Sequence, residues 1–291
     1  MKRGLKCGIS LGVFVYTVLR DSFLRLLGMS TKGTCVILYY HSVPSSQRER
    51  FARQLDVILR YAKPVAVGER LTFAPRMHYA GITFDDGFEN FAEVALPELA
   101  KRKIPSTMFV IADATGKAFG PYGRPEKVMS VEQLRALPQD LVTIGSHTLT
   151  HPYLPGLPEQ EAAHEIGRSR EQIQLMLNRS VLLFSFPFGG FSEKLIDYCR
   201  QAGYQRVFTT LPRLAFEDSG EFAVGRVRVD PDDSPLEFRL KIAGAYRWLP
   251  WAFALKRKLM PLSSSPVART NDARSDLLAS GHSVIQDPIG Q

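Results

Sequence analysis

The chain has 291 residues, of which 45% are hydrophobic and 23% are charged, so it can bury a large core without disulfides. Its three cysteines are odd in number and far apart, which excludes a disulfide scaffold and a cysteine-based zinc knuckle. The composition also excludes a collagen-like or wholly disordered chain.

The net charge of +8 is concentrated at two ends of the sequence. Residues 1–32 carry six basic side chains against Asp21, and residues 239–260 carry six and no acid. A nucleic-acid-binding protein more often carries its basic residues on the folded body, so no nucleic-acid partner is predicted. Basic, aromatic-rich ends favour contact with an anionic membrane surface, although solvated helix faces would give the same pattern. We therefore predict membrane association, on the cytoplasmic face.

Residues 1–32 predict a basic amphipathic helix. The apolar run at 7–19 is shorter than the roughly 20 residues that a membrane span needs. A charged start before an apolar run is also typical of a signal peptide, but no small-residue cleavage site follows. The prediction is a helix that lies in the interface or packs on the body, with a signal sequence or anchor as the alternative.

From residue 34, short apolar runs alternate with segments of helical spacing. The runs predict strands at 36–40, 81–84, 106–111, 142–145, 181–186 and 206–209, and the spacing predicts helices at 47–61, 91–99, 131–137, 159–177 and 195–202. This alternation implies parallel βαβ units. About seven such units suit an α/β protein with a distorted (β/α) barrel, whose chemistry lies at the carboxyl ends of its strands.

The same pass along the chain divides it into four parts. Residues 33–245 form the predicted catalytic domain behind the N-terminal helix, and 246–261 form a basic aromatic segment. Residues 262–291 are polar with little periodicity, which predicts a disordered tail.

Two motifs that follow predicted strands contain candidate metal ligands. Asp85 and Asp86 are adjacent, so they point to opposite faces and serve different purposes, although one aspartate there could simply cap a helix. His147 and His151 lie in a loop, because Pro152 and two threonines disfavour a regular helix. Together, Asp86, His147 and His151 would form a two-histidine, one-carboxylate site with positions open for water and substrate.

A third motif, Pro187-Phe188-Gly189, follows a further strand. As structure alone it is an ordinary loop. As a binding feature it predicts a rigid aromatic wall that shapes a pocket, since aromatic faces stack on sugar rings.

These motifs resemble those of the polysaccharide deacetylase family, carbohydrate esterase family 4. The matching segments are Thr83-Phe84-Asp85-Asp86-Gly87, Ser146-His147-Thr148-Leu149-Thr150-His151 and Phe186-Pro187-Phe188-Gly189. The resemblance covers about residues 34–245 and implies a distorted barrel. It also implies that Asp85 is the catalytic base and that Asp86, His147 and His151 bind one divalent metal ion, usually zinc, with other divalent transition metals possible.

The run Leu38-Tyr39-Tyr40-His41-Ser42-Val43 resembles the permuted subgroup that includes poly-N-acetylglucosamine deacetylases. In that subgroup the histidine-bearing strand comes first, which implies that His41 is the general acid. Taken alone, His41 would be interpreted as a partly buried histidine at a strand end.

Ser185 departs from the family pattern, because many members carry an arginine there that pairs with an aspartate of another motif. Arg226, Arg228 and Asp230 share one strand face by the period of two, so one of these arginines could replace it. The alternative is an impaired or differently tuned site.

The predicted function is the metal-dependent removal of N-acetyl groups from an amino-sugar polysaccharide or a lipid-linked sugar. Hydrolysis of another linear or cyclic amide on the same fold is one alternative, and a carbohydrate-binding pseudoenzyme is another. A retaining glycosidase would need Asp85 and Asp86 about 5–5.5 Å apart across a sugar. That reading leaves His147 and His151 without a role.

Overall fold

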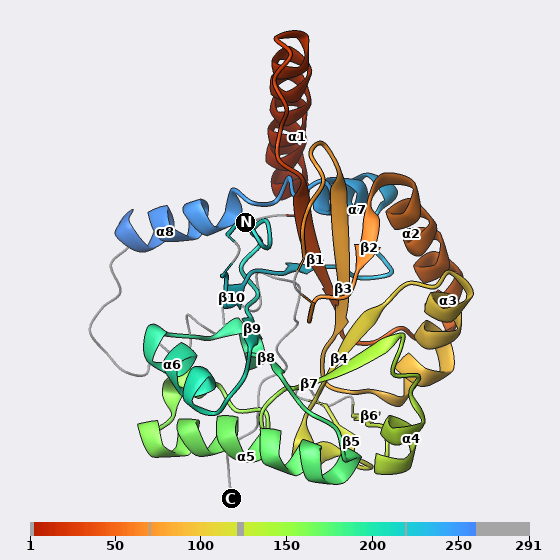
Figure 1. Ribbon diagram of the computed structural model, residues 1–291, viewed down its shortest axis with the longest axis vertical. Coiled ribbons are helices and arrows are strands. Elements are labelled where there is room, and N and C mark those ends of the chain that lie inside the picture. The colour runs from red at the N-terminus through yellow and green to blue at the C-terminus, as the bar shows by residue number, and fades with distance from the viewer. Residues whose placement is uncertain (1–2, 70, 121–124, 219, 260–291) are drawn as a thin grey trace, which may run out of the picture.

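The strands predicted from the alternating pattern pair into one parallel sheet in the computed structural model, which describes residues 3–69, 71–120, 125–218 and 220–259 (Figure 1). The strands are β1 (Thr34–Tyr40), β2 (Lys63–Val65), β3 (His78–Phe84), β4 (Ser106–Val110), β5 (Ala118–Phe119), β6 (Glu126–Lys127), β7 (Val142–Ser146), β8 (Leu183–Ser185), β9 (Arg206–Phe208), β10 (Ala223–Val224) and β11 (Val227–Arg228). The helices are α1 (Arg3–Leu26), α2 (Arg48–Tyr61), α3 (Leu96–Lys101), α4 (Val131–Ala136), α5 (Glu159–Leu177), α6 (Glu193–Gln201), α7 (Pro235–Ile242) and α8 (Leu249–Leu259).

The main sheet curls into the predicted barrel. Its strand order is β10-β9-β8-β7-β4-β3-β1-β11, with β2 paired to β3, and all of these pairs are parallel. The two marginal strands, β10 and β11, are separated in the chain only by Gly225 and Arg226. Three residue steps span at most about 11 Å, so the margins of the sheet must come together. The predicted α/β class and distorted (β/α) barrel are thus confirmed.

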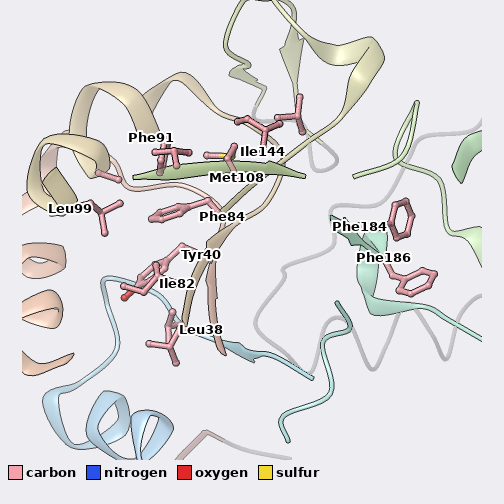
Figure 2. Close-up of a cluster of buried hydrophobic side chains, with 14 of the residues drawn as sticks. Leu38, Tyr40, Ile82, Phe84, Phe91, Leu99, Met108, Ile144, Phe184 and Phe186 are labelled. Carbon is pink, nitrogen blue, oxygen red and sulfur yellow. The ribbon is translucent and has the colours of Figure 1, made fainter. Parts of the chain in front are cut away.

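Alternation along the strands divides the core into two layers. In β1, Val36, Leu38 and Tyr40 belong to the cluster between the sheet and its helices, whereas Cys35 and Ile37 belong to a second cluster. Figure 2 shows the first cluster, in which Tyr40 stacks on Phe84 with ring centroids 5.3 Å apart. Residues of both layers are almost fully buried, which fixes the strand ends that carry the candidate site.

Several elements differ from the sequence-based expectation or were not expected. The predicted helix at 91–99 begins with a π-helical turn, η2 (Phe91–Ala95), before α3, and the strand expected at 181–186 is the shorter β8. The hairpin β5–β6, the strands β2, β10 and β11, and the helices α7 and α8 were not predicted. Two- and three-residue strands are too short to show a period of two. The tail expected at 262–291 lies outside the described residues.

The predicted N-terminal helix is present as α1 and is longer than its apolar run. It is long and apolar enough to cross a membrane, and of its residues only Ser10 is fully buried. Figure 1 shows it projecting from the body of the molecule.

Candidate active site

The candidate residues converge at the carboxyl ends of four strands of the main sheet. Asp85 and Asp86 follow β3, His147 follows β7, His41 follows β1, and Pro187 follows β8. Because these strands run parallel in the sheet, their carboxyl ends meet at one mouth of the barrel.

Asp86, His147 and His151 form a compact group of potential metal ligands. Their ligand atoms lie within 4.8 Å of one another, and the Asp86 Oδ1 atom is 3.5 Å from His147 Nε2 and 3.4 Å from His151 Nε2. A tetrahedral ion with ligands about 2.1 Å away holds neighbouring ligand atoms about 3.4 Å apart. In the described part of the chain, Asp86 Oδ1 is buried without a hydrogen-bond partner. A cation would satisfy this oxygen, so the group fits a divalent metal ion.

The backbone at these ligands is held in an uncommon conformation. Asp86 and His151 have positive φ values of 72° and 67°, as do Thr148 at 67° and Phe188 at 56°. Non-glycine residues rarely adopt this region, and such strain concentrates at functional sites. Gly87 follows Asp86 with φ 81°, which allows the chain to turn sharply out of β3.

Contacts beyond the ligand atoms fix the two histidines. His147 Nδ1 lies 2.8 Å from the Ser185 carbonyl oxygen, which accepts its proton and leaves Nε2 free to bind a metal. The loop between the histidines is held from α5, because the Glu165 carboxylate accepts bonds from the Leu149 and Thr150 N–H groups, both at 2.9 Å. It also accepts the Thr150 hydroxyl proton at 2.7 Å. Glu165 was not predicted as a site residue, although it lies on the helix predicted at 159–177.

Burial sets the protonation preferences of the group. Burial raises the pKa of Asp86 well above its ordinary value, and the charges of Asp85 and Glu126 add to this effect. Burial also lowers the pKa of His147, and it lowers that of His151 well below the usual range with help from the charges of His147 and His41. Neutral imidazoles are the form that binds a metal, and a bound cation would favour the ionised form of Asp86.

Asp85 is held in a buried ion pair instead. Arg226 Nη1 and Nη2 donate to its two carboxylate oxygens at 2.7 and 2.8 Å, and the arginine is fully buried. Burial acts to raise the pKa of Asp85, but the charge of Arg226, with smaller contributions from His147 and His41, lowers it to about 2. Asp85 is therefore ionised at every ordinary pH.

Arg226 uses its whole guanidinium in this position. Besides Asp85 it donates to Thr83 Oγ1 at 3.0 Å, to Ser185 Oγ at 2.7 Å and to the Thr209 carbonyl at 3.4 Å. The guanidinium also lies 4.6 Å from the centroid of the Tyr39 ring. All five N–H donors of an arginine can thus be satisfied, which accounts for the burial of its charge. Ser185, which departs from the family pattern, is one of its partners.

The remaining predicted residues lie at varying distances from this centre. His41 is near enough for its charge to lower the pKa of Asp85 and of His151, and its ring meets that of Tyr39 at 5.6 Å. Arg228 lies on β11, where it is in register with Tyr39 of β1. Asp230 is in a turn, where its carbonyl accepts a bond from Gln54.

An aromatic wall borders His151 on two sides. Phe188 approaches the imidazole edge-on, with ring centroids 4.7 Å apart. Its neighbours in the chain are Pro187, which is buried, and Gly189. Phe119, from the unpredicted strand β5, approaches at 5.2 Å. Gly189 also leaves room for Thr210, whose Oγ1 would lie 1.8 Å from an added Cβ. Phe119 was missed because its two-residue strand has no periodic signal.

Comparison with known proteins agrees with this geometry. Residues 74–207 match the model of the polysaccharide deacetylase family, which is slightly less than half of the chain. The resemblance inferred from the motifs is thereby confirmed, and the domain supports the prediction of a hydrolase acting on non-peptide carbon–nitrogen bonds.

One curated relative and two solved structures illustrate the similarity. The chain is 33% identical over 165 residues to the "Putative polysaccharide deacetylase YxkH" of Bacillus subtilis, which is 57% of this chain and 54% of that protein. The match thus spans about half the length of this relative. IcaB from Ammonifex degensii is 27% identical, with a TM-score of 0.61 over 74% of this chain and 97% of IcaB. The Streptococcus pyogenes deacetylase PplD, in complex with acetate, is 18% identical with a TM-score of 0.57 over 74% of this chain and 98% of PplD, and shares the fold.

Proposed function

We propose that the protein is a metal-dependent hydrolase that removes N-acetyl groups from an amino-sugar glycan. The observation that carries this proposal is the convergence of Asp86, His147 and His151, whose ligand atoms lie within 4.8 Å of one another. Beside them lies Asp85, which is ionised, paired with Arg226 and not part of the ligand group. The match to the polysaccharide deacetylase family supports it.

The proposed metal ligands are Asp86, His147 and His151. When bound, a divalent ion such as Zn²⁺ would lower the pKa of a bound water and polarise the acetyl carbonyl. The three protein ligands leave coordination positions for water and substrate, as a catalytic site requires.

The chain itself supplies the proton transfers in this proposal. Asp85 accepts the proton of the attacking water, with its orientation fixed by Arg226. His41 donates a proton to the nitrogen of the departing amino sugar. The Gly189 N–H already donates to the Phe186 carbonyl at 3.0 Å, so the Phe188 N–H is the proposed donor to the oxyanion.

The glycan is proposed to lie against Pro187, Phe188 and Gly189, with Phe119 opposite. Its source is an N-acetylated polysaccharide or a lipid-linked sugar. The second possibility agrees with a location at the cytoplasmic face of a membrane, which the basic and apolar ends of the chain support.

The test measures acetate release from a panel of N-acetylated sugars, and separately the ring opening of a cyclic imide, in the presence and absence of a chelator. We expect release from a sugar, its loss with chelator, and its loss in Asp85→Asn with the metal retained. Hydrolysis of the imide alone would support the alternative amide substrate. No hydrolysis of any substrate by the metal-loaded protein would support the pseudoenzyme.

A further inference from the structure

Helix α1 has two faces with opposite properties. One face packs on the body through residues three or four positions apart, which place them on the same side of a helix. On this docked face, Ser10 Oγ accepts a bond from Trp248 Nε1 at 2.9 Å and Thr17 Oγ1 accepts one from Arg247 at 2.7 Å. Arg3 pairs with Glu237 at 2.6 Å.

The opposite face of α1 is apolar and exposed. This outward face consists of Leu5, Gly8, Gly12, Tyr16, Leu19, Phe23 and Leu26. Its large side chains are between 57% and 85% exposed and include no charge. Contiguous exposed apolar surface of this kind marks an interaction site.

Basic residues border the far end of the outward face. Arg20 flanks it, Arg25 lies at the same end of α1 on the docked side, and Lys32 follows in the segment that leads to β1. Helix α8, which begins beside the docked face of α1, adds Trp251 at 82% exposure and Leu255 at 57%. Its sequence continues with Lys256-Arg257-Lys258. Exposed tryptophan and apolar side chains edged by bases complement the interface of an anionic bilayer.

We propose that α1 binds the protein to one leaflet of an anionic lipid bilayer without crossing it. The contact is made by the outward face and the C-terminal end of the helix. A spanning helix must place its two ends on opposite sides of about 30 Å of hydrocarbon. The docked face holds residues 3–17 of α1 along the body instead, through an ion pair and two hydrogen bonds. This inference deepens the proposed membrane location and rests on it, but not on the proposed chemistry.

The first test is co-sedimentation of the full chain with vesicles of phosphatidylcholine alone or with about one-third phosphatidylglycerol. We expect binding to the anionic vesicles that weakens with salt. The double variant Leu19→Glu/Phe23→Glu should bind at least tenfold more weakly. The control Leu59→Glu/Leu175→Glu alters exposed leucines of α2 and α5 and should bind within twofold of the parent. Arg25→Glu should cost about fivefold or more.

The second test distinguishes binding to one leaflet from spanning. Single cysteines replace Gly4 and Thr31 at the two ends of α1 in a Cys7→Ser background, where Cys35 and Cys199 are buried. A membrane-impermeant maleimide should label both positions from the same side of sealed membranes. Labelling from opposite sides would overturn the proposal in favour of an anchor.

A second copy of the chain is the competing occupant, since Gly8 and Gly12 leave open space beside the backbone. The protein would then sediment equally with both vesicle types and would dimerise in a concentration-dependent way that Leu19→Glu/Phe23→Glu abolishes. That result would establish a second copy as the partner of the outward face and would refute the lipid bilayer. Acetate release from a short soluble oligosaccharide should be unchanged in that variant, so the location and the chemistry are tested separately.

Discussion

Among the single residues of the site, Arg226 fills the role expected of an arginine where the chain has Ser185. It lies between β10 and β11, yet its guanidinium reaches Asp85 and Ser185, so the cation comes from the last strands of the barrel. From the sequence, Arg226 and Arg228 were alternatives, because the period of two placed both on one face of a predicted strand. The buried bidentate contact to Asp85 identifies Arg226.

Replacing Arg226 with lysine should shift the acid limb of the pH–rate profile. A lysine ammonium cannot donate to both oxygens of Asp85 in the fixed fork of a guanidinium. The depressed pKa of Asp85 should therefore rise, and the acid limb of kcat/KM should move to higher pH while activity above neutral pH is partly retained. Steady-state kinetics from pH 4 to 9 check this. An unmoved limb with uniformly reduced activity would contradict it.

The second expectation at this scale concerns the proposed metal ligands. His147→Ala and His151→Ala should each lose the bound metal, because two remaining ligands hold a divalent ion poorly. His164→Ala, on the neighbouring helix α5, is the control and should keep about one equivalent. Elemental analysis of protein purified without chelator measures the content. Full occupancy in His147→Ala would disprove the assignment.

The third expectation concerns His41 as proton donor. His41→Ala should reduce turnover of an N-acetyl sugar by about 10²–10⁴ while the metal is retained. Acetate esters with an aryl leaving group should lose much less, because an aryloxide needs little protonation. Parallel assays of the two substrates measure the difference. Equal losses on both would leave His41 without this role.

At the scale of elements, helix α5 acts as a template for the loop between the two histidines. Glu165 holds two N–H groups of that loop, and Ser169 Oγ lies 2.8 Å from Ser146 Oγ at the end of β7. The loop contains the positive φ values of Thr148 and His151, which these contacts help to maintain.

Glu165→Ala should therefore weaken metal binding without removing a ligand. Loss of such outer contacts typically lowers metal affinity about 10–100-fold. Glu161→Gln, one turn earlier on α5, is the matched control and should leave the affinity unchanged. Titration of the metal-free protein with Zn²⁺ in a competing chelator gives the affinities. Similar values for the two variants would rule out the template role.

Across the whole molecule, the buried pair of Asp85 and Arg226 joins the third strand to the closing margin of the barrel. Arg226→Met would leave the Asp85 charge buried alone, so we expect a loss of about 3–5 kcal/mol in the free energy of unfolding at pH 7. Because the folded pKa of Asp85 is depressed to about 2, its contribution is complete above about pH 4 and is lost as the pH falls towards 2.

Urea unfolding of both proteins at pH 7 and near pH 3 measures this. The difference between parent and variant should narrow in acid, because protonation of Asp85 removes the uncompensated charge from the variant. A difference that is the same at both pH values would show that packing, and not the ion pair, sets the cost.

The sequence predicted the elements that have a regular hydrophobic period and the motifs that carry chemistry. Residues 159–177 were predicted as a helix with the bounds that α5 has, because 19 residues show several turns of the amphipathic pattern. The strand ends and the motifs at 83–87 and 146–151 also emerged, since an apolar run that ends in paired polar residues is a local signal. Phe119, Glu165 and the choice of Arg226 did not, because each depends on a contact between segments that are distant in the chain.

The closing of the barrel also has a consequence during synthesis. A ribosome makes β1 and the aspartates long before β11, and Arg226 follows Asp85 by 141 residues. The partners that dock α1, Glu237, Arg247 and Trp248, emerge later still. A nascent chain therefore exposes an undocked apolar helix before it acquires the cation of its buried ion pair. Its first chance to meet a membrane comes well before that pair can form.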